Sequence, residues 1–282
     1  MTALELLKIG SDFLKKNQIK TYQIDSELIL SEMMGTSREN FLINSNFKIN
    51  DNQIKSFKEY ISRRAIKKEP MAYILNKKEF WSTKFKIDKG VLIPRPETEL
   101  MVEKILKYYK NSSPYVLDIG TGSGCIIISL LKELCMSKGV AIDISKQAIK
   151  IAKRNSIINN TCKRIKFINA SFMKIPNYKF DLIVANPPYI ARHQLKNLSD
   201  DIKFFEPKIA LDGGNDGLDV IRKVIYKSRK ILKTNGMLAL EIGNGQYKKA
   251  SKILKLSNFR EKFLIKDYKN NIRSVFSMLQ HY

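Results

Sequence analysis

Apolar residues recur at helical spacing through the first quarter of the chain. They fall at positions that share one face of a helix in the runs that begin at Leu4, Leu28 and Ile54. Asp25–Ser26, residues of a type that favours helix N-caps, stand just before the second of these runs. The pattern predicts a small helical bundle over residues 1–69.

The pattern changes after Pro70, a residue that interrupts helices. Apolar and polar positions alternate between Met71 and Ile93, as in short strands whose two faces differ. Residues 70–94 are therefore expected to form a linking β-hairpin.

From residue 95 to residue 282 the pattern alternates between strands and helices. Strands are expected at Tyr115–Ile119, Gly139–Asp143, Ile165–Ile168, Phe180–Ala185 and Met237–Ile242, and a terminal pair at Glu261–Lys266 and Ile272–Leu279. Helices are expected from about Pro96 and over Cys125–Lys132, Lys146–Asn159 and Asp219–Leu232. Repeated strand and helix units predict an α/β fold with a doubly wound, parallel sheet, and the last two strands predict an antiparallel hairpin at its end.

Size and charge limit the classes of protein that remain. A chain of 282 residues suits two domains of ordinary size, and its net charge of +24 attracts polyanions or acidic protein surfaces. The lysines form no single block, so the charge permits direct nucleic-acid binding without requiring it. We expect a monomer.

Several classes are disfavoured by composition. No apolar run approaches the ~20 residues of a membrane span, and the start of the chain lacks the pattern of a secretory signal, so we expect a cytoplasmic protein without a membrane partner. Its 3 cysteines lack metal-ligand spacing and its 2 histidines lie far apart, so we expect neither a disulfide framework nor a bound metal.

A glycine-rich turn follows the first expected strand of the α/β region. The turn reads Gly120-Thr121-Gly122-Ser123-Gly124, and a helix is expected directly after it. Glycines permit unusual backbone angles and let a ligand touch the backbone. Asp143 ends the next strand, where a carboxylate can accept both hydroxyls of a ribose. The combination predicts a site for a nucleoside cofactor.

A second motif, Asn186-Pro187-Pro188-Tyr189, ends a later strand of the same expected sheet. Asn186 offers a carbonyl acceptor, and each proline keeps its backbone carbonyl while lacking an amide hydrogen. Tyr189 adds a flat face and a hydroxyl. These types suit the clamping of an NH2 group that is conjugated to a carbonyl or an aromatic ring, and the carboxyl edge of the sheet brings the clamp to the glycine turn.

At this point the chain resembles the class I S-adenosylmethionine-dependent methyltransferases, and within them the protein-(glutamine-N5) methyltransferases of the HemK/PrmC type. Three further features carry the resemblance: Leu92–Glu99 (Leu-Ile-Pro-Arg-Pro-Glu-Thr-Glu), Phe204–Asp212 followed by Gly217, and the order of helical start, hairpin and α/β region. The resemblance implies a seven-stranded methyltransferase sheet preceded by the helical bundle, which would recognise the substrate protein.

The resemblance also implies a substrate, a cofactor and residue roles. The substrate would be the Gly-Gly-Gln loop of class-1 peptide-chain release factors, methylated at the glutamine amide nitrogen by S-adenosylmethionine. The implied cofactor contacts are Gly120, Thr121, Gly122, Ser123, Gly124, Asp143, Ser171, Phe172 and Asn186, with Asp143 at the ribose. The family often has an acidic residue and then a bulky one where this chain has Ser171 and Phe172, so Phe172 would take the stacking role.

On the substrate side, Asn186 and the Pro187 carbonyl would accept the two amide hydrogens, and Tyr189 would pack beside the amide. These three are the candidate catalytic residues, and Pro188 and Arg95 are candidate substrate contacts. Arg95 could equally cap the linker. Two alternatives stay open: a glutamine methyltransferase of a ribosomal protein, and a methyltransferase of adenine amino groups in DNA or RNA, which shares the Asn-Pro-Pro-Tyr motif.

Overall fold

The structure, a computed structural model, describes residues 2–43, 48–176 and 178–280. The chain divides into two compact units. Unit 1 comprises Met1–Asn76 with Ser199–Phe205, and unit 2 comprises Lys77–Leu198 with Glu206–Tyr282.

Unit 1 is helical. Its helices are α1 (Ala3–Lys16), α2 (Tyr22–Met33), α3 (Arg38–Ile43), α4 (Asp51–Ala65), α5 (Met71–Ile74) and α9 (Asp200–Phe205). Thr2 and Asn50 begin α1 and α4 with reciprocal capping boxes, which satisfy backbone donors that a helix start leaves free. Leu14, Ile29 and Phe57 are among the buried residues that form the core of this unit. A Cβ on Gly10 would meet the Phe57 ring at 2.6 Å, so the helices approach closely there.

Two expectations for unit 1 are wrong. Asp25 and Ser26 do not cap a helix but lie inside α2, which begins at Tyr22. Asp25 is buried there, and the Arg64 guanidinium donates to its carboxylate at 2.7 Å. Met71–Ile74, expected as part of a strand, is a short helix instead.

Unit 2 contains a hairpin and a sheet. The hairpin pairs β1 (Lys77–Phe80) with β2 (Thr83–Lys86), antiparallel. The sheet consists of β3 (Tyr115–Ile119), β4 (Lys138–Asp143), β5 (Ile165–Asn169), β6 (Phe180–Ala185), β7 (Leu232–Glu241), β8 (Phe259–Lys266) and β9 (Ile272–Leu279). Their order is β5-β4-β3-β6-β7-β9-β8. The first five run parallel, and β9 is antiparallel to both β7 and β8. The expected seven-stranded sheet with a terminal antiparallel hairpin is confirmed.

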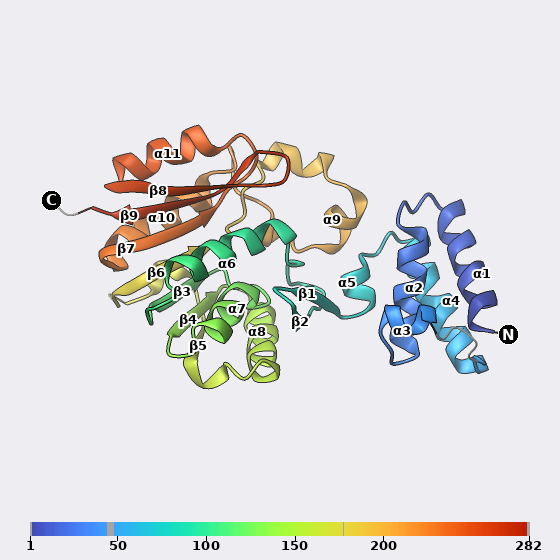
Figure 1. The fold of residues 1–282 in the computed structure, drawn as a ribbon. Coiled ribbons are helices and arrows are strands. Elements are labelled where there is room, and N and C mark those ends of the chain that lie inside the picture. Colours follow the sequence, from blue (N-terminus) through green and yellow to red (C-terminus); the bar gives the residue numbers. More distant parts are fainter. Residues whose placement is uncertain (1, 44–47, 177, 281–282) are drawn as a thin grey trace. The chain divides into compact units, whose positions relative to one another are not determined.

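Helices cover both faces of this sheet. They are α6 (Pro96–Tyr108), α7 (Cys125–Glu133), α8 (Lys146–Ile158), α10 (Asp219–Ile231) and α11 (Tyr247–Leu256). Figure 1 shows α6, α7 and α8 grouped on one side, with α10 and α11 on the other. Ile225 of α10 and Leu254 of α11 share a buried cluster with Leu117 and Ile183 of the central strands. The doubly wound architecture is therefore confirmed, and it leaves the carboxyl ends of β3, β4 and β6 at one edge.

Short helical turns η3 (Arg192–Asn197) and η4 (Lys208–Ala210) lie in the long connection between β6 and α10, and η1 (Cys162–Arg164) and η2 (Phe172–Lys174) flank β5. Among the described residues, no helix combines the length and the apolar character that crossing a membrane would need.

Candidate active site

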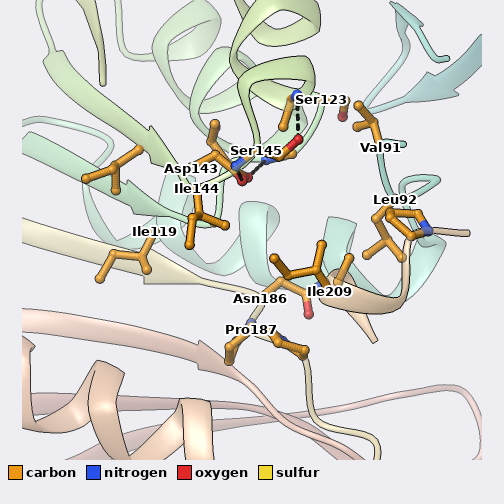
Figure 2. A pocket seen from close by; sticks show the side chains of 18 of the residues that line it. Val91, Leu92, Ile119, Ser123, Asp143, Ile144, Ser145, Asn186, Pro187 and Ile209 are labelled. Atoms are coloured by element: carbon orange, nitrogen blue, oxygen red, sulfur yellow. Dashed lines mark hydrogen bonds between the residues drawn. The ribbon is translucent and has the colours of Figure 1, made fainter. Parts of the chain in front are cut away.

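A cavity of about 260 Å³ lies at the carboxyl edge of the parallel strands of unit 2. Ile119, Asp143 and Asn186 reach it from the ends of β3, β4 and β6 (Figure 2). Leu92 and Ile209 add apolar surface from the segments before α6 and after β6. Chain segments far apart in sequence therefore meet around one space.

The glycine turn lines this cavity with backbone. Gly120, Gly122 and Gly124 have φ angles of 71°, 55° and 81°, values that L side chains rarely adopt. A Cβ on Gly120 would meet nothing within 4 Å, whereas one on Gly124 would meet Ile128 at 2.8 Å. Gly120 thus leaves open space beside the cavity, and Gly124 permits close packing of α7.

Hydrogen bonds hold the glycine turn in place. The amide groups of Gly120 and Thr121 both donate to the Ile142 carbonyl on β4, at 2.9 and 3.1 Å. The Thr121 hydroxyl donates to the buried Asp118 carboxylate at 2.7 Å. Burial raises the pKa of Asp118 to about 7.

Asp143 joins the turn to the end of β4. Its two carboxylate oxygens accept the amides of Gly122 at 3.0 Å and Ser145 at 2.8 Å. Burial raises the pKa of Asp143, and these backbone bonds oppose the rise. Each carboxylate oxygen can accept more than one hydrogen bond, so acceptor capacity remains for a ligand hydroxyl.

Ser171 and Phe172 also line the cavity, at the start of η2. The Ser171 hydroxyl accepts the Met173 amide at 3.3 Å. The Lys227 ammonium from α10 supports this turn, because it donates to the Ile175 and Met173 carbonyls at 2.6 and 3.3 Å.

The Asn186–Tyr189 motif divides into two parts. Asn186, Pro187 and Pro188 line the cavity. Tyr189 does not belong to the lining, and its hydroxyl accepts a hydrogen bond from Arg273 at 3.1 Å. The Arg273 guanidinium also lies 5.5 Å from the centre of the tyrosine ring, and burial raises the pKa of Tyr189.

The backbone at Tyr189 is closely enclosed. Its carbonyl accepts the Gln246 side-chain amide at 2.8 Å, and a Cβ on Gly217 would meet the same oxygen at 2.4 Å. A Cβ on Gly213 would meet the Tyr189 backbone at 2.8 Å. The end of the motif therefore has a fixed backbone path.

Arg95 lines the cavity, and its guanidinium donates to both carboxylate oxygens of Glu206 at 2.7 Å. Glu206 is buried, whereas the Arg95 side chain is 29% exposed. The pair joins the start of α6 to the chain after β6, which is compatible with the linker role that the sequence left open.

Two residues without an assigned role from sequence are linked to Asn186: Thr98, which also lines the cavity, and Glu241, which does not. The Asn186 side-chain amide donates to the Thr98 hydroxyl at 3.3 Å, and that hydroxyl donates to the Glu241 carboxylate at 2.7 Å. Glu241 is completely buried at the end of β7, and burial raises its pKa to about 7. No spacing rule could have joined these residues, because Thr98 and Glu241 are 143 positions apart.

These features fit an S-adenosyl cofactor. Glycines offer a backbone surface with open space at Gly120, and Asp143 offers a carboxylate with acceptor capacity. Phe172 supplies an aromatic face at the lining. Among the described residues, no group of His, Cys, Asp or Glu side chains is arranged to hold a metal ion.

Comparison with solved structures identifies the fold. A ribosomal protein L11 methylase from Lactobacillus delbrueckii subsp. bulgaricus is similar with a TM-score of 0.52 at 20% identity, over 69% of this chain and 84% of that chain. A methyltransferase from Pyrococcus furiosus is similar with a TM-score of 0.54 at 15% identity, over 82% and 100%. Most of the chain thus has the fold of these methyltransferases.

Sequence comparison identifies the family. The family model for the PrmC N-terminal domain matches residues 5–75, and the model for ribosomal protein L11 methyltransferase (PrmA) matches residues 95–208. A protein of Clostridium acetobutylicum named release factor glutamine methyltransferase is 39% identical over 87% of each chain. One of the same name from Fusobacterium nucleatum subsp. nucleatum is 36% identical over 96% of this chain and 77% of that protein.

The chain belongs to the release factor glutamine methyltransferase family. The resemblance inferred from the sequence is confirmed, and membership makes the chain an S-adenosylmethionine-dependent methyltransferase.

Proposed function

We propose that this enzyme methylates the side-chain amide nitrogen of the glutamine in the Gly-Gly-Gln loop of class-1 peptide-chain release factors. The observation that carries the proposal is that Asn186 and Pro187 line the same cavity as the glycine turn and Asp143. An amide clamp and a nucleoside site therefore adjoin.

Gly120–Gly124, Asp143, Ser171 and Phe172 would hold S-adenosylmethionine, with Asp143 at the ribose hydroxyls. When bound, the cofactor supplies an activated sulfonium methyl group. The bonds from Gly122 and Ser145 to Asp143 keep the carboxylate facing the turn. Lys227 anchors the backbone directly after Phe172, whose side chain lies at the cavity wall.

The clamp would place the substrate rather than ionise it. An amide nitrogen is a weak nucleophile because its lone pair is shared with the carbonyl. Acceptance of its two hydrogens by the Asn186 side chain and the Pro187 carbonyl would fix the plane of the amide. Correct placement of reacting groups can supply up to ~7 to 11 kcal/mol of a barrier. Tyr189, held by Arg273, would pack beside this plane.

The helical region would recognise the release factor. The PrmC N-terminal domain match, residues 5–75, lies within unit 1, and unit 1 has a hydrophobic core of its own. We assign residues 1–69 to recognition and 95–282 to catalysis, with residues 70–94, which contain α5 and the β1–β2 hairpin, linking them. A substrate that works on the ribosome places the proposed activity in the cytoplasm.

A substrate panel tests this proposal. The purified enzyme is incubated with labelled S-adenosylmethionine and, separately, with release factor, ribosomal proteins, DNA and RNA. We expect label in the release factor and its loss when the loop glutamine is replaced by alanine. Label in ribosomal protein or nucleic acid, with none in release factor, would replace the proposal with one of the alternatives.

A further inference from the structure

A line of three side chains runs from the cavity into the protein interior. Asn186 and Thr98, on α6, both line the cavity, and Glu241, at the end of β7, accepts the Thr98 hydroxyl from the buried side. The distances are 3.3 Å from Asn186 Nδ2 to Thr98 Oγ1 and 2.7 Å from Thr98 Oγ1 to Glu241 Oε2. Thr98 is 2% exposed and Glu241 is 0% exposed, so the bond between them is shielded from water, whereas the bond from Asn186 is partly buried.

The hydrogens available on these groups determine which of them donates in each hydrogen bond. A threonine hydroxyl has one hydrogen, and a carboxylate can only accept. The Thr98 hydrogen therefore goes to Glu241, and the Thr98 oxygen is left as an acceptor. Only the nitrogen end of the Asn186 amide can donate to it. Since the two ends of a primary amide point in different directions, the Asn186 oxygen is directed away from Thr98.

We propose that Thr98 and Glu241 are positioning residues that keep the Asn186 amide oriented with its nitrogen toward Thr98, so that its oxygen stays available as the acceptor of the clamp. The inference rests on the proposed function for the identity of the clamped group. It goes beyond that function because it assigns the orientation of the clamp to a buried carboxylate that touches no substrate.

Protonation of Glu241 would remove the constraint on which group donates in these hydrogen bonds. A neutral carboxyl group can donate to Thr98, which frees the threonine hydrogen to point at Asn186 and lets the amide turn over. The charged or titratable groups that face Glu241 are Arg273 on β9, Glu97 on α6, Tyr189 after β6 and Cys125 on α7. Burial raises the pKa of Glu241 to about 7 and Glu97 adds to the rise, whereas hydrogen bonds from Thr98 and Asn186 and the charge of Arg273 favour the ionised form. The orientation should therefore weaken as the pH falls through about 7.

The first test needs neither substrate nor cofactor. Side-chain amide signals of Asn186 are assigned by NMR, with Asn186→Ala identifying them by their loss, and are followed from pH 5.5 to pH 8.5. We expect them to titrate with a midpoint near the pKa of Glu241. Glu241→Gln should abolish this titration, and Thr98→Val should shift the signals. Asp118→Asn is the control. It changes the carboxylate of a second buried threonine–carboxylate pair, Thr121 and Asp118, and should leave the titration in place. The proposal would be overturned if the Asn186 signals did not change with pH, or if Asp118→Asn abolished their titration and Glu241→Gln did not.

The second test separates positioning from folding. With release factor as substrate, Thr98→Val should lower kcat about 30-fold, equivalent to about 2 kcal/mol, while calorimetric binding of S-adenosylhomocysteine stays near the wild-type value. Thr98→Ser keeps the hydroxyl and should recover kcat to within about threefold. Glu241→Gln should have a low kcat without the acidic limb of the wild-type pH profile.

The outcomes distinguish the two proposals. A wild-type enzyme that does not label release factor refutes the proposed function and leaves the NMR test decisive for the orientation. If the wild-type enzyme labels release factor and both Thr98→Val and Glu241→Gln turn over at the wild-type rate, the positioning role alone is refuted.

Discussion

Replacing Glu241 by glutamine should stabilise unit 2 at alkaline pH. Glu241 is 0% exposed, and burial raises its pKa from 4.5 to about 7. The folded protein therefore retains a proton on this group over a pH range in which the unfolded chain has released it. Stability from this group is highest below the unfolded pKa and declines as the pH rises through the folded pKa.

The size of the decline follows from the two pKa values. A rise from 4.5 to about 7 corresponds to about 3 kcal/mol of unfolding free energy, of which about 2 kcal/mol falls between pH 5 and pH 8. Glutamine has nearly the same shape and no charge to bury. The difference in unfolding free energy, variant minus wild type, should therefore increase by about 2 kcal/mol from pH 5 to pH 8.

Urea unfolding followed by tryptophan fluorescence can measure this difference. Trp81 is the single tryptophan of the chain and belongs to unit 2, so its signal reports on the unit that contains Glu241. Glu103→Gln removes a carboxylate that is 44% exposed and serves as the control for loss of one negative charge. Asp118→Asn, at a second buried carboxylate, should change in the same direction as Glu241→Gln.

Parallel pH dependence in wild type and Glu241→Gln would refute this reasoning, because it would mean that Glu241 titrates alike in the folded and unfolded chains. The expected result also links stability to function. The carboxylate that we propose to orient Asn186 destabilises the fold at the pH at which it is ionised.

Three further changes have defined outcomes. Gly120→Val should weaken S-adenosylhomocysteine binding by about tenfold or more, as measured by calorimetry. The new side chain would stand beside the cavity, and a φ of 71° would cost a valine about 1 to 2 kcal/mol of backbone strain. Unchanged affinity would show that the turn does not contact the cofactor. Lys227→Met should lower stability by about 1 to 3 kcal/mol and reduce cofactor affinity, because the Met173 and Ile175 carbonyls lose a buried donor. Urea unfolding that finds the variant as stable as wild type would contradict this. Arg95→Ala should lower stability by about 1 to 3 kcal/mol, because the buried Glu206 carboxylate loses a charged hydrogen-bond donor; a urea midpoint equal to that of wild type would contradict this.

The fold could be predicted from the sequence wherever its signals are local. Apolar runs such as Tyr115–Ile119 and Phe180–Ala185 form strands because both faces of a parallel sheet are covered by helices. Asp25 was misread because its type favours N-caps, whereas its partner, Arg64, lies 39 positions away. Met71–Ile74 was misread because a short apolar run fits a helix as well as a strand.

The candidate site was predictable for a related reason. Gly120 and Asn186 directly follow parallel strands and Asp143 ends one, and parallel strands bring their carboxyl ends to one edge. The contacts behind these residues were not predictable. Thr98 and Glu241, or Tyr189 and Arg273, meet through the order of strands in the sheet, which sequence spacing does not encode. Their roles, like those of the lining residues, stay predictions.

Mass spectrometry of the methylated release factor tests the central claim most directly. Wild-type enzyme should add one methyl group to the side-chain nitrogen of the loop glutamine. Asn186→Ala should bind S-adenosylhomocysteine nearly as wild type does and lose at least about 100-fold in turnover, equivalent to about 3 kcal/mol. A methyl group on another residue, or wild-type turnover by Asn186→Ala, would contradict the account.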